Sequence, residues 1–113
     1  MIDRISPGDL PTWLENQRPH GEAIVLDVRE PVELTTASIQ PEGFKLVTIP
    51  MGQLMERLQE LDPAQPVACL CHHGSRSMQV ANFLASRGFA HVANITGGIN
   101  AWSAQVDPRV PTY

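Results

Sequence analysis

Four short apolar runs constrain the fold of this chain more than any other feature. They occupy residues 23–28, 46–50, 66–71 and 91–96. Continuous apolar runs of this length are typical of strands buried on both faces of a sheet. Segments with helix signals separate them, and strands that alternate with helices form a parallel sheet covered on both faces. With a short opening strand at residues 2–5, the pattern predicts an α/β fold around a parallel sheet of four to five strands.

The segments between the runs carry the helix signals. Ser6 followed by Pro7 is typical of a helix start, and Gly88 is typical of the left-handed residue that ends a helix. Residues 51–61 place apolar side chains at helical spacing, and Asp62-Pro63 stops that pattern. We therefore expect a helix there with one apolar stripe, made of Leu54, Met55, Leu58 and Leu61.

Length and charge narrow the classes of protein. A chain of 113 residues suits one domain, residues 1–113, with 110–113 as a tail. A net charge of −4 without a basic cluster argues against a nucleic acid or a membrane as partner. No apolar run is long enough to span a bilayer and no secretion signal is visible, so we expect a cytoplasmic protein. Because the net charge is negative and repels small anions, any anion site must be built locally from amides, Arg and His.

The predicted sheet brings distant residues to one edge. Parallel strands end at a shared carboxyl edge, and ligands bind there. This edge collects Asp27 and Arg29 after one run, Cys71 after another, and Thr96-Gly97-Gly98 after the last. We expect Asp27 and Arg29 to support a site around Cys71; the alternatives are that they only pair with each other or cap the next segment.

The segment from Cys71 to Ser77 runs from a strand directly into a helix. Ser75 or Ser77 could cap this helix, and unpaired amides with the positive end of the helix dipole favour a thiolate nearby. Gly74 allows the backbone to turn inward. Such a nest of amides also holds an anion. The alternative is a strand-to-helix turn whose cysteine has no chemical role.

The other cysteine, Cys69, lies two positions earlier in the same strand. It is expected as a buried small apolar side chain, because a disulfide between positions i and i+2 would be strained. Cys69, Cys71, His72 and His73 do not form a metal site by this reasoning, because consecutive residues rarely converge on one tetrahedral ion. Neither a metal nor a cofactor is expected.

Three ordered motifs carry a family resemblance: "LDVREPVE" at residues 26–33, "CHHGSRS" at 71–77 and "NITGGINAW" at 94–102. Over residues 24–102 the chain resembles a single-domain rhodanese (thiosulfate sulfurtransferase-like) protein. The resemblance implies that Cys71 carries a sulfane sulfur as a persulfide. It assigns the loop around that sulfur to His72, His73, Gly74, Ser75 and Arg76, with Asp27, Arg29 and Ser77 in support.

Loop length adds a distinction within that resemblance. Family members that handle sulfur have four residues between the cysteine and the arginine, as here between Cys71 and Arg76, whereas related phosphatases and arsenate reductases have five. The chain departs from the family at residues 36–39, where Thr-Ala-Ser-Ile replaces a Gly-His-Ile motif. Contacts of the divergent 34–45 segment with the site are therefore open.

The predicted function is transfer of a sulfane sulfur from thiosulfate or a related donor to cyanide, a thiol or a protein. Arg76 is expected to dock the small anionic donor, since its planar fork suits a sulfonate. His72 and His73 add polarity, and Glu30 and Glu33 are expected on a solvated helix face. The alternatives are a sulfur-relay or regulatory binding module, and a phosphatase or arsenate reductase on the same scaffold.

Overall fold

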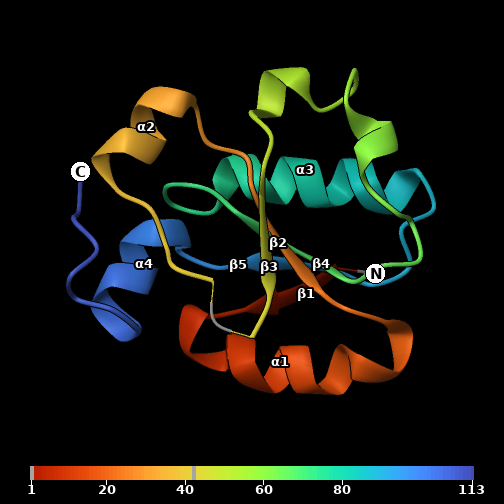
Figure 1. Cartoon of the computed structure of the whole chain (residues 1–113), viewed down its shortest axis with the longest axis horizontal. Helices are drawn as coiled ribbons and strands as arrows, with labels where there is room; N and C mark the ends of the chain where they lie inside the picture. Colours follow the sequence, from red (N-terminus) through yellow and green to blue (C-terminus); the bar gives the residue numbers. More distant parts are fainter. Residues whose placement is uncertain (1, 42) are drawn as a thin grey trace.

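A five-stranded parallel sheet forms the centre of the computed structural model, which describes residues 2–41 and 43–113 (Figure 1). The strand order is β1-β5-β4-β2-β3, and every neighbouring pair is parallel. The predicted α/β class and parallel sheet are confirmed. The strands are β1 (Ile2–Ile5), β2 (Ile24–Asp27), β3 (Lys45–Thr48), β4 (Val67–Leu70) and β5 (Val92–Ile95).

The register of the sheet determines what lies beside the cysteine strand. Cys69 in β4 is paired with Leu26 of β2 on one side and with Asn94 of β5 on the other. Because all strands run the same way, the residues after β2, β4 and β5 emerge at one edge. Cys71 therefore leaves the sheet between the ends of β2 and β5.

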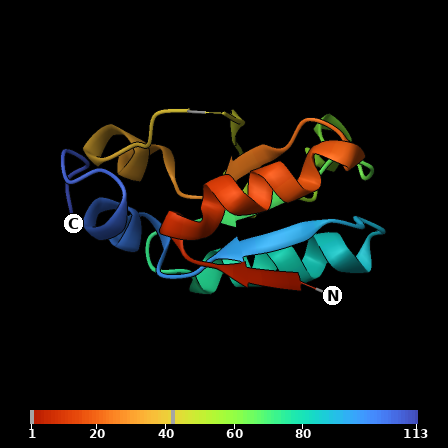
Figure 2. The ribbon, with the colours of Figure 1, turned by 90° about the horizontal axis from the view of Figure 1, so that it is seen from below.

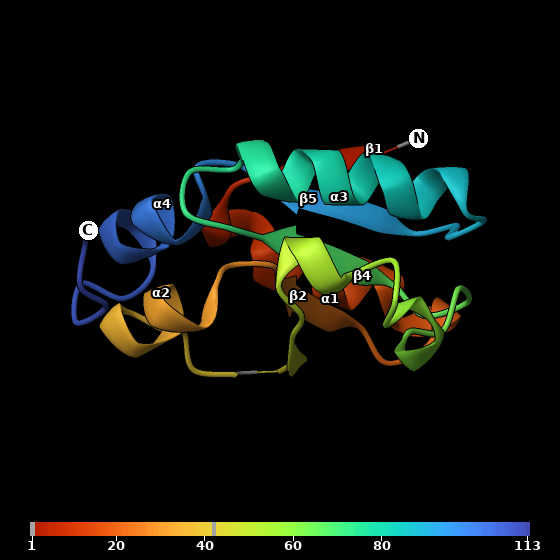
Figure 3. The ribbon, with the colours of Figure 1, turned by 90° about the horizontal axis from the view of Figure 1, so that it is seen from above.

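Helices cover both faces of the sheet, as expected. Helix α1 lies on one face and α3 on the other, while α2 and α4 lie toward the carboxyl edge (Figures 2 and 3). Two buried apolar clusters separate these layers, and adjacent strand residues alternate between them: Leu26 belongs to the α3 side and Val25 to the α1 side. The helices are α1 (Leu10–Gln17), α2 (Pro31–Thr36), α3 (Ser75–Ser86) and α4 (Gly98–Gln105).

Burial separates the inner strands from the edge strand β3. Strands β2, β4 and β5 are buried at all four positions, as continuous apolar runs predict. Strand β3 is exposed at its two ends and half-buried between them. The expectation of burial on both faces is wrong for β3, because this strand has a neighbour on only one side.

The helix expected at residues 51–61 is replaced by short 3-10 turns, Met51–Gln53 and Leu58–Glu60. Leu54 and Leu61 are buried, but Met55 is 72% exposed, so the predicted stripe is wrong at Met55. Tight turns also place residues three apart on one side, so they bury Leu61 and half-bury Leu58 much as an α-helix would.

The helix boundaries agree with several local signals. Pro7 opens a 3-10 turn, Pro7–Asp9, before α1, although the Ser6 side chain makes no capping hydrogen bond. Gly88 has the expected positive φ of 91° after α3. Within residues 2–41 and 43–113, the helices are all too short or too polar to cross a membrane.

Candidate active site around Cys71

Cys71 follows β4 directly and lies at the base of the loop that leads into α3. Its side chain is nearly inaccessible, with 1% of the residue exposed. The backbone N–H of Gly74 donates to Cys71 Sγ at 3.0 Å. Gly74 has a φ of 107° and is the N-cap of α3, which turns the loop back over the sulfur. The first turn of α3 adds N–H groups that have no partner within the helix.

Gly74 is held from behind by a side chain of the neighbouring strand. Asn94 Nδ2, from β5, donates to the carbonyl oxygen of Gly74 at 3.2 Å, and the Ser77 hydroxyl bonds to Asn94 Oδ1. Both side chains are buried away from water, so each needs the other as a hydrogen-bond partner. Neither Ser75 nor Ser77 caps α3 through its side chain, so that expectation is wrong; Gly74 occupies the N-cap position instead.

The start of α4 fixes the other side of the loop. The N–H groups of Ile99 and Asn100 donate to the carbonyl oxygens of Cys71 (2.8 Å) and His72 (3.1 Å). Gly98 makes this approach possible, because a Cβ there would lie 2.3 Å from the Cys71 carbonyl oxygen. The Thr96-Gly97-Gly98 turn therefore meets the Cys71 loop, as the shared carboxyl edge predicted.

Asp27 and Arg29 form a buried ion pair at the end of β2. Arg29 Nη2 lies 2.7 Å from Asp27 Oδ2, and the two side chains are 0% and 1% exposed. Burial opposes the charge of Arg29, but its hydrogen bonds with Asp27 and Tyr113 prevail and raise the pKa of Arg29. The pairing considered from the sequence is confirmed.

Arg76 forms a bidentate ion pair with Glu33 of α2. Its two terminal nitrogens lie 2.6 and 2.7 Å from the two carboxylate oxygens. The Glu33 side chain is only 16% exposed. The expectation that Glu33 lies on a solvated face is therefore wrong, whereas Glu30 is exposed as expected. The Arg76 guanidinium is the main cause that lowers the pKa of Glu33 to about 2.

Three aromatic rings are stacked at the mouth of the loop. The ring of His72 lies 3.8 Å from that of His73 on one side and 3.8 Å from that of Tyr113 on the other. Tyr113 comes from the segment expected as a tail. This contact has no signal in the sequence, because nothing local indicates where the segment after α4 runs.

Cys69 does not share the surroundings of Cys71. It is fully buried in β4, and this burial raises the pKa of its thiol far above the usual range, with a smaller contribution from Cys71. Both cysteines are free. Among the described residues, no three His, Cys, Asp or Glu side chains are grouped to hold a metal ion.

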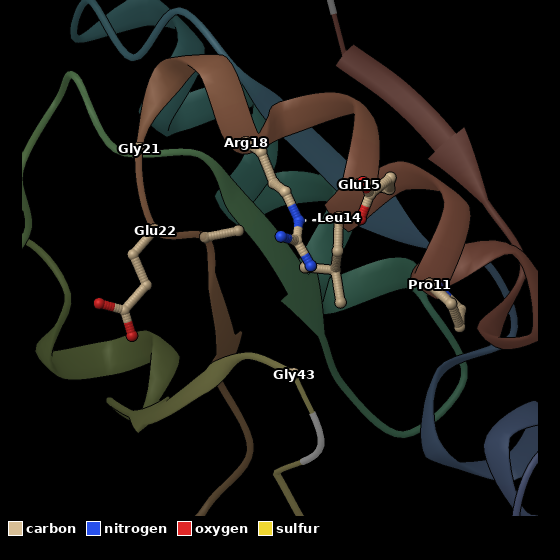
Figure 4. A pocket seen from close by; sticks show the side chains of 8 residues that line it. Pro11, Leu14, Glu15, Arg18, Gly21, Glu22 and Gly43 are labelled. Atoms are coloured by element: carbon tan, nitrogen blue, oxygen red, sulfur yellow. Dashed lines mark ion pairs between the residues drawn. The ribbon is translucent and has the colours of Figure 1, made fainter.

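Two of the hollows among the described residues lie near different ends of the sheet. One of about 660 Å³ lies between α1 and the start of β2, where Glu15 and Arg18 pair with each other (Figure 4). Its lining contains no cysteine or histidine. A second, of about 280 Å³, lies beside the Cys71 loop and is lined by His73, Gly74 and Ser75, together with Arg4 and Asn94. Of these two, only the second adjoins the loop that carries the candidate chemistry.

Comparison with known proteins agrees with this geometry. A model of the family described as the rhodanese-like domain matches residues 10–105. A sulfurtransferase of Allochromatium vinosum is 32% identical over 89 residues, which cover 79% of this chain and 79% of that protein. The crystal structure of a rhodanese-related protein from Thermoplasma volcanium superposes with a TM-score of 0.73 at 31% identity, covering 98% of this chain and 99% of the other.

A plant relative shares more of its sequence but is a longer protein. The chloroplastic rhodanese-like/PpiC domain-containing protein 12 of Arabidopsis thaliana is 48% identical over 96 residues, 81% of this chain. The chain spans 31%, 23% and 24% of the length of the first three curated relatives. The printed name of this plant relative places it in the chloroplast, so the cytoplasmic location of the present chain stays a prediction.

The fold, the loop and the family match together define the class. The chain belongs to the rhodanese-like domain family. The resemblance seen in the three sequence motifs is thereby confirmed.

Proposed function

We propose that the protein is a sulfurtransferase in which Cys71 accepts a sulfane sulfur and passes it on as a persulfide. The observation that carries this proposal is the N–H of Gly74 directed at Cys71 Sγ at 3.0 Å, in a loop fixed by α4 and Asn94. A fixed N–H donor stabilises negative charge on a sulfur atom without reorganising during the reaction. The name of the Allochromatium relative supports the same general activity.

The first half-reaction is a displacement at sulfur. The Cys71 thiolate attacks the outer sulfur of thiosulfate, an S–S bond forms to Cys71, and the S–S bond of the donor breaks. Sulfite leaves with the electron pair of the broken bond. The terminal sulfur of the persulfide then carries the negative charge, and the loop amides of residues 72–76 bind it.

The second half-reaction returns the enzyme to its starting state. The carbon of cyanide, or the sulfur of a thiolate, attacks the terminal persulfide sulfur. The S–S bond breaks, its electron pair returns to Cys71, and thiocyanate or a new persulfide leaves. The cycle needs neither a cofactor nor an external oxidant or reductant.

Arg76 contributes positive charge to the loop while it remains paired with Glu33. Both of its terminal nitrogens are engaged by that carboxylate, so a donor sulfonate would compete with Glu33 for the guanidinium. We therefore propose that the loop amides make most of the contacts with the donor anion. Arg76 maintains the shape of the loop and adds positive charge to it. Asp27, Arg29 and Ser77 support the loop without touching the transferred sulfur.

Intact mass spectrometry after incubation with thiosulfate tests this assignment. We expect a gain of one sulfur atom that persists in Cys69→Ala and disappears in Cys71→Ser. Thiocyanate release from thiosulfate and cyanide should follow the same pattern. Turnover at the parent rate in Cys71→Ser would overturn the proposal.

A sulfur-relay module that receives sulfur only from a protein is the second candidate. The 1% exposure of Cys71 favours this second candidate. A thiol so well covered would receive sulfur when a partner protein opens the loop. No mass gain with thiosulfate, but a Cys71 persulfide after incubation with a cysteine desulfurase, would support this candidate. Hydrolysis of p-nitrophenyl phosphate without sulfur transfer would instead indicate a phosphatase.

A further inference from the structure

The segment after α4 is anchored to the body of the protein before it reaches the loop that carries Cys71. Val110 is 5% exposed, and its carbonyl oxygen accepts a hydrogen bond from the Ser103 hydroxyl of α4 at 2.6 Å. The segment then runs beside α4 and α2, where its end lies (Figures 1 and 3). Val110 fixes the segment to α4, and a hydrogen bond between Tyr113 and Glu33 fixes its end to α2. These two points define its course over the carboxyl edge.

Tyr113 makes three specific contacts at the end of this segment. Its ring lies 3.8 Å from the ring of His72 with an angle of only 6° between their planes. Its hydroxyl donates to Glu33 Oε2 at 2.7 Å and accepts from Arg29 Nη1 at 3.0 Å. The hydroxyl thus joins the Asp27–Arg29 pair to the Arg76–Glu33 pair.

These contacts place Tyr113 beside the loop that carries Cys71. His72 is the residue after Cys71, and Tyr113 covers one face of its ring. Arg76, from the same loop as Cys71, and the Tyr113 hydroxyl bind the same Glu33 carboxylate. Tyr113 is 39% exposed, whereas Cys71 is 1% exposed, so Tyr113 meets solvent and the Cys71 side chain does not.

We propose that Tyr113 is a specificity-determining residue that limits the size of the molecule able to reach Cys71. As a restriction on the sulfur acceptor, this inference rests on the proposed function. A small acceptor such as cyanide needs little room beside the loop. A larger thiol must displace Tyr113 and break its stack with His72 and both hydrogen bonds of its hydroxyl.

Alkylation of Cys71 measures this access without requiring sulfur transfer. The wild type, Tyr113→Phe and Tyr113→Ala are each treated with iodoacetamide and with the bulky N-(1-pyrenyl)maleimide, and labelling is followed by intact mass. We expect Tyr113→Ala to raise the ratio of the bulky to the small rate by about five- to tenfold. Tyr113→Phe keeps the ring and loses only the hydroxyl bonds, so its ratio should rise less.

Two controls make the result specific. Cys71→Ser reports any background labelling of Cys69, and Val106→Ala removes an exposed apolar side chain from the start of the same segment without changing the ratio. Thermal melting shows whether each variant is folded. A folded Tyr113→Ala protein with the wild-type ratio would overturn the proposal.

Sulfur transfer then supplies an independent comparison. In Tyr113→Ala, kcat/KM for glutathione as acceptor should rise relative to kcat/KM for cyanide by a similar factor. If the wild type forms no persulfide from thiosulfate while the alkylation ratio still rises, small-molecule sulfur transfer is contradicted and control of access by Tyr113 is supported. One of the two proposals can therefore be contradicted while the other is supported.

Discussion

The guanidinium of Arg76 is held by the carboxylate of Glu33 through two parallel contacts of 2.6 and 2.7 Å. This pair ties the first turn of α3 to α2, two elements that are far apart in the sequence. Fork-to-fork geometry fixes direction as well as distance. The position of the Cys71 loop therefore depends on a carboxylate outside that loop.

Glu33→Gln should lower the stability of the protein by an amount that depends on pH. The pKa of Glu33 is lowered from 4.5 to about 2 in the folded protein, chiefly by Arg76. The ion pair thus contributes stability above about pH 4.5, and this contribution is lost as the pH falls toward 2. At pH 7 we expect Glu33→Gln to cost roughly 1–2 kcal/mol, since Arg76 is partly exposed and screened. Urea unfolding of both proteins at pH 7, 4 and 3 should show the difference shrinking; a constant difference would contradict this.

Asp27→Asn should destabilise the protein more strongly than Glu33→Gln does. The substitution leaves the Arg29 charge buried at 0% exposure without its carboxylate partner. Breaking a buried pair on one side typically costs about 3–5 kcal/mol. Guanidinium unfolding measures the loss, and Glu60→Gln, which breaks the exposed pair with Arg57, should leave the midpoint nearly unchanged. Equal midpoints for Asp27→Asn and wild type would contradict the role of the pair.

Gly98→Ala should disrupt the loop that holds Cys71. The new Cβ would lie 2.3 Å from the Cys71 carbonyl oxygen and 2.5 Å from that of His72, both backbone atoms that cannot rotate away. We expect a loss of about 2 kcal/mol or more, together with slower persulfide formation. Gly52→Ala is the matched control, since nothing lies within 4 Å of its added Cβ. Normal stability and persulfide formation in Gly98→Ala would show that α4 does not fix the loop.

Asn94→Ala should impair the orientation of the Gly74 peptide behind Cys71. It removes the donor to the Gly74 carbonyl oxygen and leaves the buried Ser77 hydroxyl with one partner fewer. A buried group left unsatisfied costs about 1–3 kcal/mol. We expect the maximal rate of persulfide formation to fall more than the affinity for thiosulfate. The double variant with Ser77→Ala should be less than additive, because the two side chains act as one network; strict additivity would contradict the network.

Short-range features of the site could be predicted from the sequence. Strand, cysteine, turn and helix follow one another within residues 67–86, so local patterns place Cys71 at a helix start. The same holds for Asp27 and Arg29, which are two positions apart at the end of a buried strand. Helical spacing was misleading at Met55, because two tight turns bury Leu54 and Leu61 and half-bury Leu58 without an α-helix.

The partners that surround the loop could not be predicted in this way. Glu33 is 43 residues from Arg76, and Tyr113 is 80 residues from Glu33. Asn94 is one polar residue within an apolar run, and no local pattern distinguishes it as part of the site. Its role appears only when β5 is placed beside β4 and its side chain meets Gly74.

The sequence by itself determined the parallel sheet, the carboxyl edge at which the site lies and the cysteine at its centre, because these depend on hydrophobic pattern and on turns of a few residues. Only the tertiary structure decided that Glu33 holds Arg76, that Asn94 holds Gly74 and that Tyr113 covers His72. Such contacts depend on strand order and on the path of the segment after α4, and neither is encoded in any local stretch of the chain.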